Sequence, residues 1–483
     1  MRKGSSAGVS ARSCVTFGLL LSAVLSTAGQ SASARSLEET IQITLETNPE
    51  VGVVQADREA VEQELRQARA LWFPSVDARA AAGPEYTNSP GTRNRTTRPP
   101  GGDASTTLLR MESQLTLTQM LFDGFETRSE VDRQLARIDS AAYRVREAAE
   151  FVALDAAEAH LDVLRNQALV ELAEQNIAEH RQILGQVRAL ERDGGGTIAD
   201  VRQTEARVAA ADTALAAALG NLRDARARYI AVVGVPPEDL TDPAAPFIAL
   251  PESDEAAAAR ATFGNPTVLI ADADIEAAQA ELMGARSAYY PRLDLEAGVG
   301  ANENLDGIQG GNVDAQALVV LRYNLFRGGA DVAREREAYF RIKEAREALR
   351  RVRREAEEEA RLSYNALRTA QARVEALREQ AEATRATRDA YAQQFDLGQR
   401  SLLDLLDAEN ELFIARTNLV TAEVTEVFAV YRVLAVIGDL LMVMDLDPPK
   451  EAINIFRDRR EAIHELPPGQ QAVQVEPQPW RRR

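Results

Sequence analysis

Residues 115–135 read LTLTQMLFDGFETRSEVDRQL, and residues 319–339 read VVLRYNLFRGGADVAREREAY. Each stretch begins with apolar residues at a spacing of two, passes through Leu-Phe-x-Gly and enters a long run without proline. A period of two is typical of a strand with one apolar face, whereas proline-free runs of Ala, Glu, Arg and Leu favour helix. The same strand–turn–helix junction therefore occurs twice, which indicates an internal duplication.

Other residues recur in the same order. Asn48-Pro49 returns 217 residues later as Asn265-Pro266, and Leu121-Phe122 returns 204 residues later as Leu325-Phe326. The spacing falls from 217 to 204, so the first half holds 13 additional residues, and the Pro- and Gly-rich loop Pro84–Thr107 accounts for them. Three turn residues keep the shorter spacing: Gly194, Asp200 and Gly234 return as Gly398, Asp404 and Gly438.

The duplication predicts four segments: a signal peptide (1–34), a first repeat (35–252), a second repeat (253–446) and a proline-rich, extended or disordered tail (447–483). The first repeat would hold strands 75–82 and 108–121 and a helical hairpin 125–234; the second would hold strands 292–301 and 313–325 and a hairpin 328–438. The first helix of each hairpin would be about 100 Å long. A seven-residue repeat indicates coiled-coil packing in the last helix: Ala408, Ala415, Ala422, Ala429 and Val436.

The amino terminus has the features of a secretory signal. Arg2, Lys3 and Arg12 form a basic region before an apolar run over residues 14–25, and Ala32-Ser-Ala34 suits signal peptidase. The only cysteine, Cys14, lies within this segment, so the mature chain would have no disulfide or thiol chemistry. Because no later apolar run reaches the length of a spanning helix, entry into a membrane would need a β-barrel.

The predicted strands carry apolar residues on one face and charged residues on the other. Leu109, Met111 and Leu115 alternate with Arg110 and Glu112, as barrel strands between lipid and a wet lumen do. Four strands cannot close a membrane barrel, so several copies would share one. Aromatic residues flank all four strands, either as an interfacial girdle against outer-membrane lipid or as plugs of the helix–strand junctions: Trp72, Phe73, Tyr289, Tyr290, Phe122 and Phe326.

Composition argues against several other classes of protein. The net charge of -18 disfavours nucleic-acid binding, which needs clustered cations. The three histidines, His160, His180 and His464, are scattered and suggest no metal site. No phosphate loop or nucleophile motif occurs, so we expect neither an enzyme nor a cofactor.

Residues 395–410 read FDLGQRSLLDLLDAEN. Together with Leu-Phe-Asp-Gly-Phe at 121–125 and the repeated Asn-Pro pairs, this motif resembles the TolC-family outer-membrane factors, especially the type I secretion branch that exports large adhesins. The resemblance covers about residues 37–446. It implies a mainly α fold with a small transmembrane β portion: a homotrimer whose twelve-stranded β-barrel is continuous with a periplasmic twelve-helix α-barrel tunnel.

The resemblance also implies functional residues. The family's periplasmic gate positions match Asp200, Arg400 and Phe395, and its pore-constricting aspartates match Asp404 and Asp407. The family prototype has a tyrosine at the Phe395 position and a threonine at the Ala199 position, so two gate hydroxyls are missing here. The aspartates would form acidic rings that favour cations, although both also suit a solvated helix face.

Three functions stay open from the sequence. The first is an outer-membrane channel for protein export, with a periplasmic adaptor and an inner-membrane ABC transporter as partners. The second, in the same fold, is the outlet of a multidrug or metal efflux pump driven by protons. The third is a periplasmic coiled-coil adaptor or scaffold, which would have no use for amphipathic strands with aromatic ends.

Overall fold

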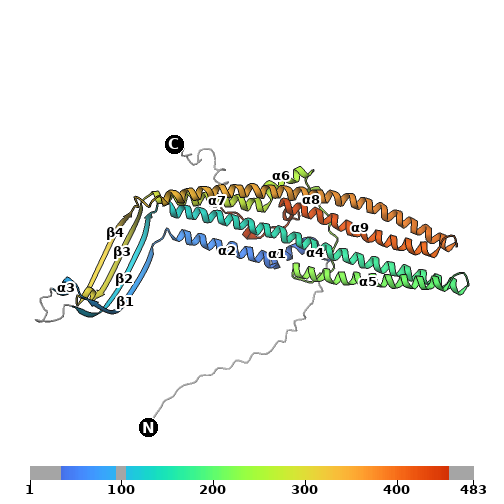
Figure 1. Ribbon diagram of the computed structural model, residues 1–483, viewed down its shortest axis with the longest axis horizontal. Coiled ribbons are helices and arrows are strands. Elements are labelled where there is room, and N and C mark those ends of the chain that lie inside the picture. The colour runs from blue at the N-terminus through green and yellow to red at the C-terminus, as the bar shows by residue number, and fades with distance from the viewer. Residues whose placement is uncertain (1–33, 94–104, 456–483) are drawn as a thin grey trace, which may run out of the picture.

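The computed structural model describes residues 34–93 and 105–455 of the chain. The molecule is elongated, with a four-stranded sheet at one end and long helices that run from it to the other end (Figure 1). Almost all of the predicted signal peptide, the middle of the predicted loop and most of the predicted tail lie outside the described residues.

Two 67-residue helices, α4 (Glu126–Arg192) and α8 (Ala330–Asp396), form the length of the molecule. Each reverses at the end far from the sheet and returns as a 36-residue helix, α5 (Ile198–Val233) or α9 (Leu402–Ile437) (Figure 1). The two hairpins therefore have identical helix lengths, as a duplicated sequence requires. The five residues of the predicted seven-residue repeat in α9, from Ala408 to Val436, are all buried, which confirms its coiled-coil packing.

A shorter helix pair precedes each strand pair. These helices are α1 (Leu37–Thr47), α2 (Pro49–Ala70), α6 (Asp254–Gly264) and α7 (Pro266–Ala285). Asn48 and Asn265 cap α2 and α7, and each side-chain amide also donates to a carbonyl near the end of a return helix: Val232 O at 3.1 Å and Val436 O at 2.9 Å. The repeated Asn-Pro pair thus begins a helix and fastens it to the hairpin of the same half.

The main core lies at mid-length, where α1, α6 and the end of α9 pack against the middle of α4 and α8 (Figure 1). Tyr431, Leu434 and Ile437 of α9 are almost completely buried there, together with Ile41 of α1. The remaining elements are short: α3 (Pro90–Arg93), α10 (Leu440–Val443), η1 (Phe247–Ala249), η2 (Arg286–Tyr289), η3 (Leu305–Gly307) and η4 (Lys450–Ala452).

The sheet is antiparallel and keeps the chain order β1-β2-β3-β4. Its strands are β1 (Ser75–Thr87), β2 (Thr106–Phe122), β3 (Arg292–Glu303) and β4 (Gly311–Arg322). Leu115 lies between Ala78 and Val299, whereas the preceding residue, Gln114, lies between Arg79 and Gly300. The register therefore places the apolar residues on one face and the polar residues on the other, as the alternation predicts.

Two strand boundaries differ from the prediction by three residues or more, and four others differ by one or two. β1 extends beyond Ala82 to Thr87. Pro84 has no backbone N–H to donate, but β1 is an edge strand, so no neighbouring strand needs that hydrogen bond on its open side. β4 ends at Arg322 rather than Leu325, because its partner β3 starts only after Pro291 and the last pair is Arg292 with Arg322. Residues 323–325 consequently have no β3 residue opposite them.

A bulge interrupts β2 just before α4. Met120 pairs with Asp294 and Phe122 pairs with Leu293, so Leu121 is the extra residue. Without the bulge, Phe122 would point to the polar face of the sheet. The bulge turns it to the apolar face, opposite Leu293.

The start of the predicted tail is seated on the helices. Ile455 packs against the apolar cluster between α2 and α4, and its backbone N–H donates to Asp139 Oδ1 at 2.8 Å. Asn454 Nδ2 donates to the Tyr143 hydroxyl at 2.8 Å. Every helix within the described part of the chain falls short of the length and apolarity that a membrane span needs.

Candidate functional site

The far end of the helices, here called the tip, is built twice by the same local signals. Gly194 and Gly398 have positive φ angles of 78° and 69°, which reverses the chain after α4 and after α8. Thr197 and Ser401 then cap the return helices, each accepting from the backbone N–H three residues on, at Asp200 or Asp404. Asp200 and Asp404 therefore occupy the same position in the first turn of α5 and α9.

Asp200 is engaged within its own helix end. Its Oδ2 accepts from the Thr197 backbone N–H at 3.0 Å and from the Thr197 hydroxyl at 2.7 Å, forming a capping box. A carboxylate here also faces the positive end of the helix dipole. Asp200 therefore stabilises the start of α5 within a single protomer.

Arg400 makes its contacts within the α8–α9 turn. Its guanidinium lies 4.0 Å from the centre of the Tyr391 ring, and its Nε donates to Gln394 Oε1 at 3.1 Å. Its Nη1 is 3.7 Å from Asp404 Oδ2. Among the described residues no ion pair joins Arg400 to Asp200, so their gate contact stays a prediction for the assembled protein.

Phe395 belongs to an apolar cluster that holds the two hairpins together at the tip. We call this the tip cluster; its buried members are Ile183, Val187, Val201, Leu402, Leu405 and Leu406. Phe395 is half-buried against it, together with Leu184 and Ala392. A phenyl ring suits this packing, whereas a tyrosine hydroxyl there would need a partner.

Asp407 pairs with a residue that the sequence did not single out. Arg207 Nη2 of α5 donates to Asp407 Oδ1 of α9 at 2.7 Å. The two residues are 200 positions apart, and only the packing of the two hairpins brings them together. No local motif could have revealed this contact.

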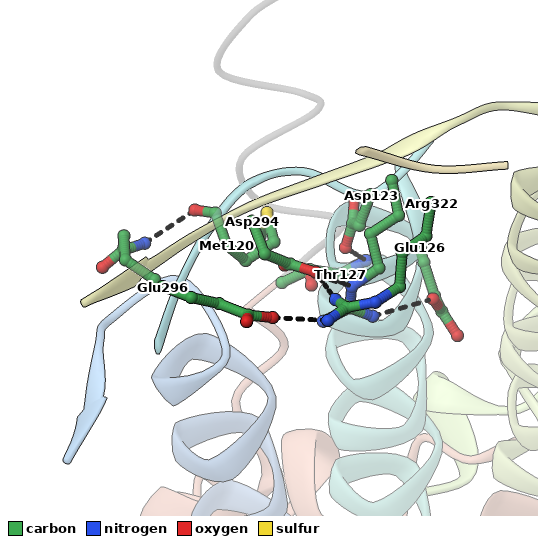
Figure 2. A network of polar contacts seen from close by, with 9 residues as sticks. Met120, Asp123, Glu126, Thr127, Asp294, Glu296 and Arg322 are labelled. Carbon is green, nitrogen blue, oxygen red and sulfur yellow. Dashed lines mark hydrogen bonds and ion pairs between the residues drawn. The ribbon is translucent and has the colours of Figure 1, made fainter. Parts of the chain in front are cut away.

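A second polar site lies where the sheet meets the helices (Figure 2). The carboxylate of Asp294 is almost completely buried on the polar face of β3, where Arg322 Nη1 donates to it at 2.7 Å and Arg292 Nε at 3.1 Å. Arg322 also pairs with Glu296, so one guanidinium of β4 holds two carboxylates of β3. Two charge-assisted partners compensate the desolvation of Asp294.

Three of the aromatic residues at the junction contact one another. Phe122, Phe125 and Tyr290 pack edge-to-face with ring centres 5.5 to 6.5 Å apart. Trp72, Phe73, Tyr289 and Phe326 are exposed near the same end of the sheet, and the Tyr289 hydroxyl donates to Glu335 Oε2 at 2.9 Å. The junction therefore has both a packed aromatic plug and exposed aromatic side chains.

Glu150 is a buried carboxylate at mid-length that the sequence analysis did not identify. Its Oε2 accepts from the Leu440 backbone N–H at 3.1 Å, which fastens the start of α10 to α4. Burial raises the pKa of Glu150 to about 7, against the opposing effect of the nearby Arg146 cation. Arg146 itself donates to Gly438 O at 2.9 Å.

The described residues contain no group of histidine, cysteine and acidic side chains arranged to hold a metal ion. His160 is buried and bonded to Thr40 Oγ1 and to Thr241 O, both at 3.0 Å. Burial lowers the pKa of His160, which favours a neutral ring that joins α1, α4 and the segment after α5. This histidine has a structural explanation.

Comparison with known proteins agrees with the fold. Residues 40–235 and 258–438 match the family described as outer membrane efflux protein. The chain is 29% identical over 323 residues to the outer membrane efflux protein BepC of Brucella suis, covering 67% of this chain and 71% of BepC. It is 26% identical to the alkaline protease secretion protein AprF of Pseudomonas aeruginosa, covering 82% of each chain.

Solved structures show the same architecture. The CusC channel superposes with a TM-score of 0.70 at 14% identity, covering 83% of this chain and 92% of CusC. The outer membrane protein VceC of Vibrio cholerae superposes with a TM-score of 0.67 at 19% identity, covering 83% and 96%. With the duplicated hairpins and the two-faced sheet, these matches show that the chain belongs to the outer membrane efflux protein family, the TolC family, and is an outer-membrane channel with a helical tunnel in the periplasm.

Proposed function

We propose that this channel is the outer-membrane component of a type I secretion system and that its cargo is protein. The observation that carries the proposal is its likeness, over most of its length, to two secretion proteins. AprF is one, and the proteases secretion protein PrtF of Dickeya chrysanthemi is the other, at 25% identity over 83% of this chain and 87% of PrtF. The motif at residues 395–410 supports the same branch.

The proposed assembly is a homotrimer. The sheet has two open edges, β1 and β4, whose backbone groups need partners inside a lipid bilayer. Pairing β4 of one copy with β1 of the next would satisfy both edges, and three copies would complete the twelve-stranded barrel that the family resemblance implies. Native mass measurement in mild detergent tests this, and a folded monomer would contradict it.

The proposed partners are a periplasmic adaptor and an inner-membrane ABC transporter, which would supply the energy that a passive channel lacks. In the proposed closed state the channel narrows at the tip. The gate residues would be Asp200, Arg400 and Phe395, and the constriction would be lined by Asp404 and Asp407. Two observations support the proposed gate: Phe395 packs in the tip cluster between the two hairpins, and Arg400 contacts Tyr391 and Gln394 in the α8–α9 turn beside it.

Gene deletion tests the function directly. Proteins that disappear from the culture medium of the deletion strain, and return with the plasmid-borne gene, would identify the cargo. In vivo cross-linking from tip positions should capture an adaptor together with an ABC transporter. Unchanged secreted proteins would contradict the proposal.

A second function has one specific observation in its favour. BepC, an efflux protein, shares 29% identity with this chain, which is higher than the identity to AprF. If the deletion strain loses resistance to drugs or metals but secretes the same proteins, the channel serves an efflux pump. Cross-linking would then capture a proton-driven pump instead of an ABC transporter.

A further inference from the structure

The α4–α5 hairpin and the α8–α9 hairpin meet at the tip through one apolar and one polar contact. The tip cluster supplies the apolar contact, from α4 and α5 on one side and α9 on the other. Arg207–Asp407 supplies the polar one, and in the part of the chain that the structure describes it is the only ion pair between the α4–α5 hairpin and the α8–α9 hairpin. Any motion that separates the hairpins at the tip must break it.

The same ion pair changes the charge of the proposed constriction. Both aspartates that the family resemblance places there have an arginine nearby: Arg400 lies 3.7 Å from Asp404, and Arg207 lies 2.7 Å from Asp407. Only the second distance is that of a charge-assisted hydrogen bond. Arg207 is therefore the residue that most directly offsets an acidic charge at this level.

The duplication did not produce this pair. At the spacing of 204 residues, Arg207 corresponds to Glu411 and Asp407 corresponds to Gln203. Glutamate and glutamine cannot form an ion pair with each other. The arginine–aspartate pair therefore belongs to one of the two related helix contacts and marks the α5–α9 contact within a protomer.

We propose that Arg207 is a latch residue that holds the α5 and α9 helices together in the closed tip and sets the ion selectivity of the pore by neutralising Asp407. The proposal rests on the proposed gate at the tip. The two side chains of the Arg207–Asp407 pair are partly exposed, 35% for Arg207 and 52% for Asp407, so salt can screen the pair. An exposed pair of this kind shifts an equilibrium by about 1.5- to 5-fold per copy.

The two halves of the latch have opposite effects on selectivity but the same effect on opening. Arg207→Gln removes the pair and leaves Asp407 uncompensated, so the pore should open more often and become more cation-selective. Asp407→Asn also removes the pair but leaves Arg207 uncompensated, so the pore should open more often and become less cation-selective. A purely structural role would not produce this opposition.

The test uses the purified full chain in planar lipid bilayers under a KCl gradient. Open probability reports the latch, and reversal potential reports the pore charge. The charge-swapped protein Arg207→Asp with Asp407→Arg should recover part of the closure, because the ion pair can form again. Arg181→Gln is the matched control, since it breaks the Arg181–Asp212 pair within one hairpin at 3.1 Å and should change neither quantity.

Each outcome decides between the alternatives. Open probabilities that stay at the wild-type value in both single variants would overturn the latch. Reversal potentials that move in the same direction in both variants, or that stay at the wild-type value, would overturn the neutralisation of Asp407 by Arg207. If every tip variant keeps the open probability and the reversal potential of the wild-type channel, the proposed gate itself is overturned. Failure of the secretion proposal appears separately, as unchanged secreted proteins in the deletion strain.

Discussion

Glu150 and Gly124 show how single positions hold the channel together. Glu150 accepts a hydrogen bond from the backbone N–H of Leu440. Burial and the nearby Asp439 disfavour its negative charge, while Arg146 stabilises it. Gly124 has a φ of +71° at the turn from β2 into α4, where a Cβ atom would lie 2.7 Å from both Ser287 O and Tyr290 Cβ. One position is constrained by charge and the other by space.

The pKa of Glu150 predicts a pH-dependent stability. A carboxylate whose pKa is raised on folding contributes stability that is fully present below its unfolded pKa of 4.5 and is lost as pH rises through about 7. Glu150→Gln keeps an acceptor for Leu440 without the charge, so the variant should unfold at a higher temperature than wild type above pH 7. The gap should close toward pH 4.5. Thermal unfolding across this range measures it, with Glu171→Gln on the exposed side of α4 as the control.

Gly124→Ala should be more damaging than the same change at the related position of the second repeat. Gly328 has a similar φ of +64°, but a Cβ atom there would meet nothing within 4 Å. Gly328→Ala carries only the backbone strain, about 1 kcal/mol, whereas Gly124→Ala adds a clash with backbone and should lose roughly a further 1–3 kcal/mol. Denaturant unfolding of the two variants compares them. Equal losses would show that the β2–α4 junction can shift to admit a methyl group.

At the scale of elements, the tip is the weakest contact between the two hairpins. The mid-length core buries large side chains such as Tyr431 and Leu434, whereas the tip relies on six buried aliphatic residues and a single described ion pair. Movement should therefore be largest at the tip and smallest at mid-length, because fewer apolar contacts have to be broken.

Arg400 is predicted to keep the tip closed. Arg400→Ser would remove its stacking on Tyr391 and its contacts with Gln394 and Asp404, and with them any link to Asp200 of a neighbouring copy. We expect higher single-channel conductance and cells sensitised to large antibiotics such as vancomycin. Arg385→Ser is the control, because Arg385 is an exposed arginine of α8 that lies before the tip turn. Wild-type conductance at all salt concentrations would show that Arg400 does not contribute to the gate.

At the scale of the whole molecule, the sheet and the tip lie at opposite ends, and each end should meet a different compartment (Figure 1). The connection between β1 and β2 lies at the end of the sheet far from the helices, as does the shorter connection between β3 and β4. Outer-membrane barrels place their longer loops outside the cell. The helices then extend into the periplasm.

An epitope inserted between Arg93 and Ser105, near Asn94, should be labelled by antibody on intact cells. The same epitope inserted after Gly195, at the tip, should be labelled only after the outer membrane is permeabilised. Signal from the tip epitope alone on intact cells would reverse the orientation. Fluorescence of fixed cells with and without permeabilisation measures both.

The sequence by itself determined the repeating parts of this protein. The two spacings, the period-two strands and the proline-free helices predicted a duplicated chain of strand pairs and long hairpins, because these signals are local and recur along the chain. The motif at residues 395–410 added the resemblance to the family, and the comparisons confirm the family and its fold. The sequence also nominated Phe395 and Arg400 for the gate and Asp404 for the pore constriction, and these roles stay predictions. Tertiary structure alone decided the pairing of Arg207 with Asp407, the burial of Glu150 and the bulge that turns Phe122. Packing, ion pairs and burial join residues hundreds of positions apart, and no pattern within a single segment records which helix its neighbour will be.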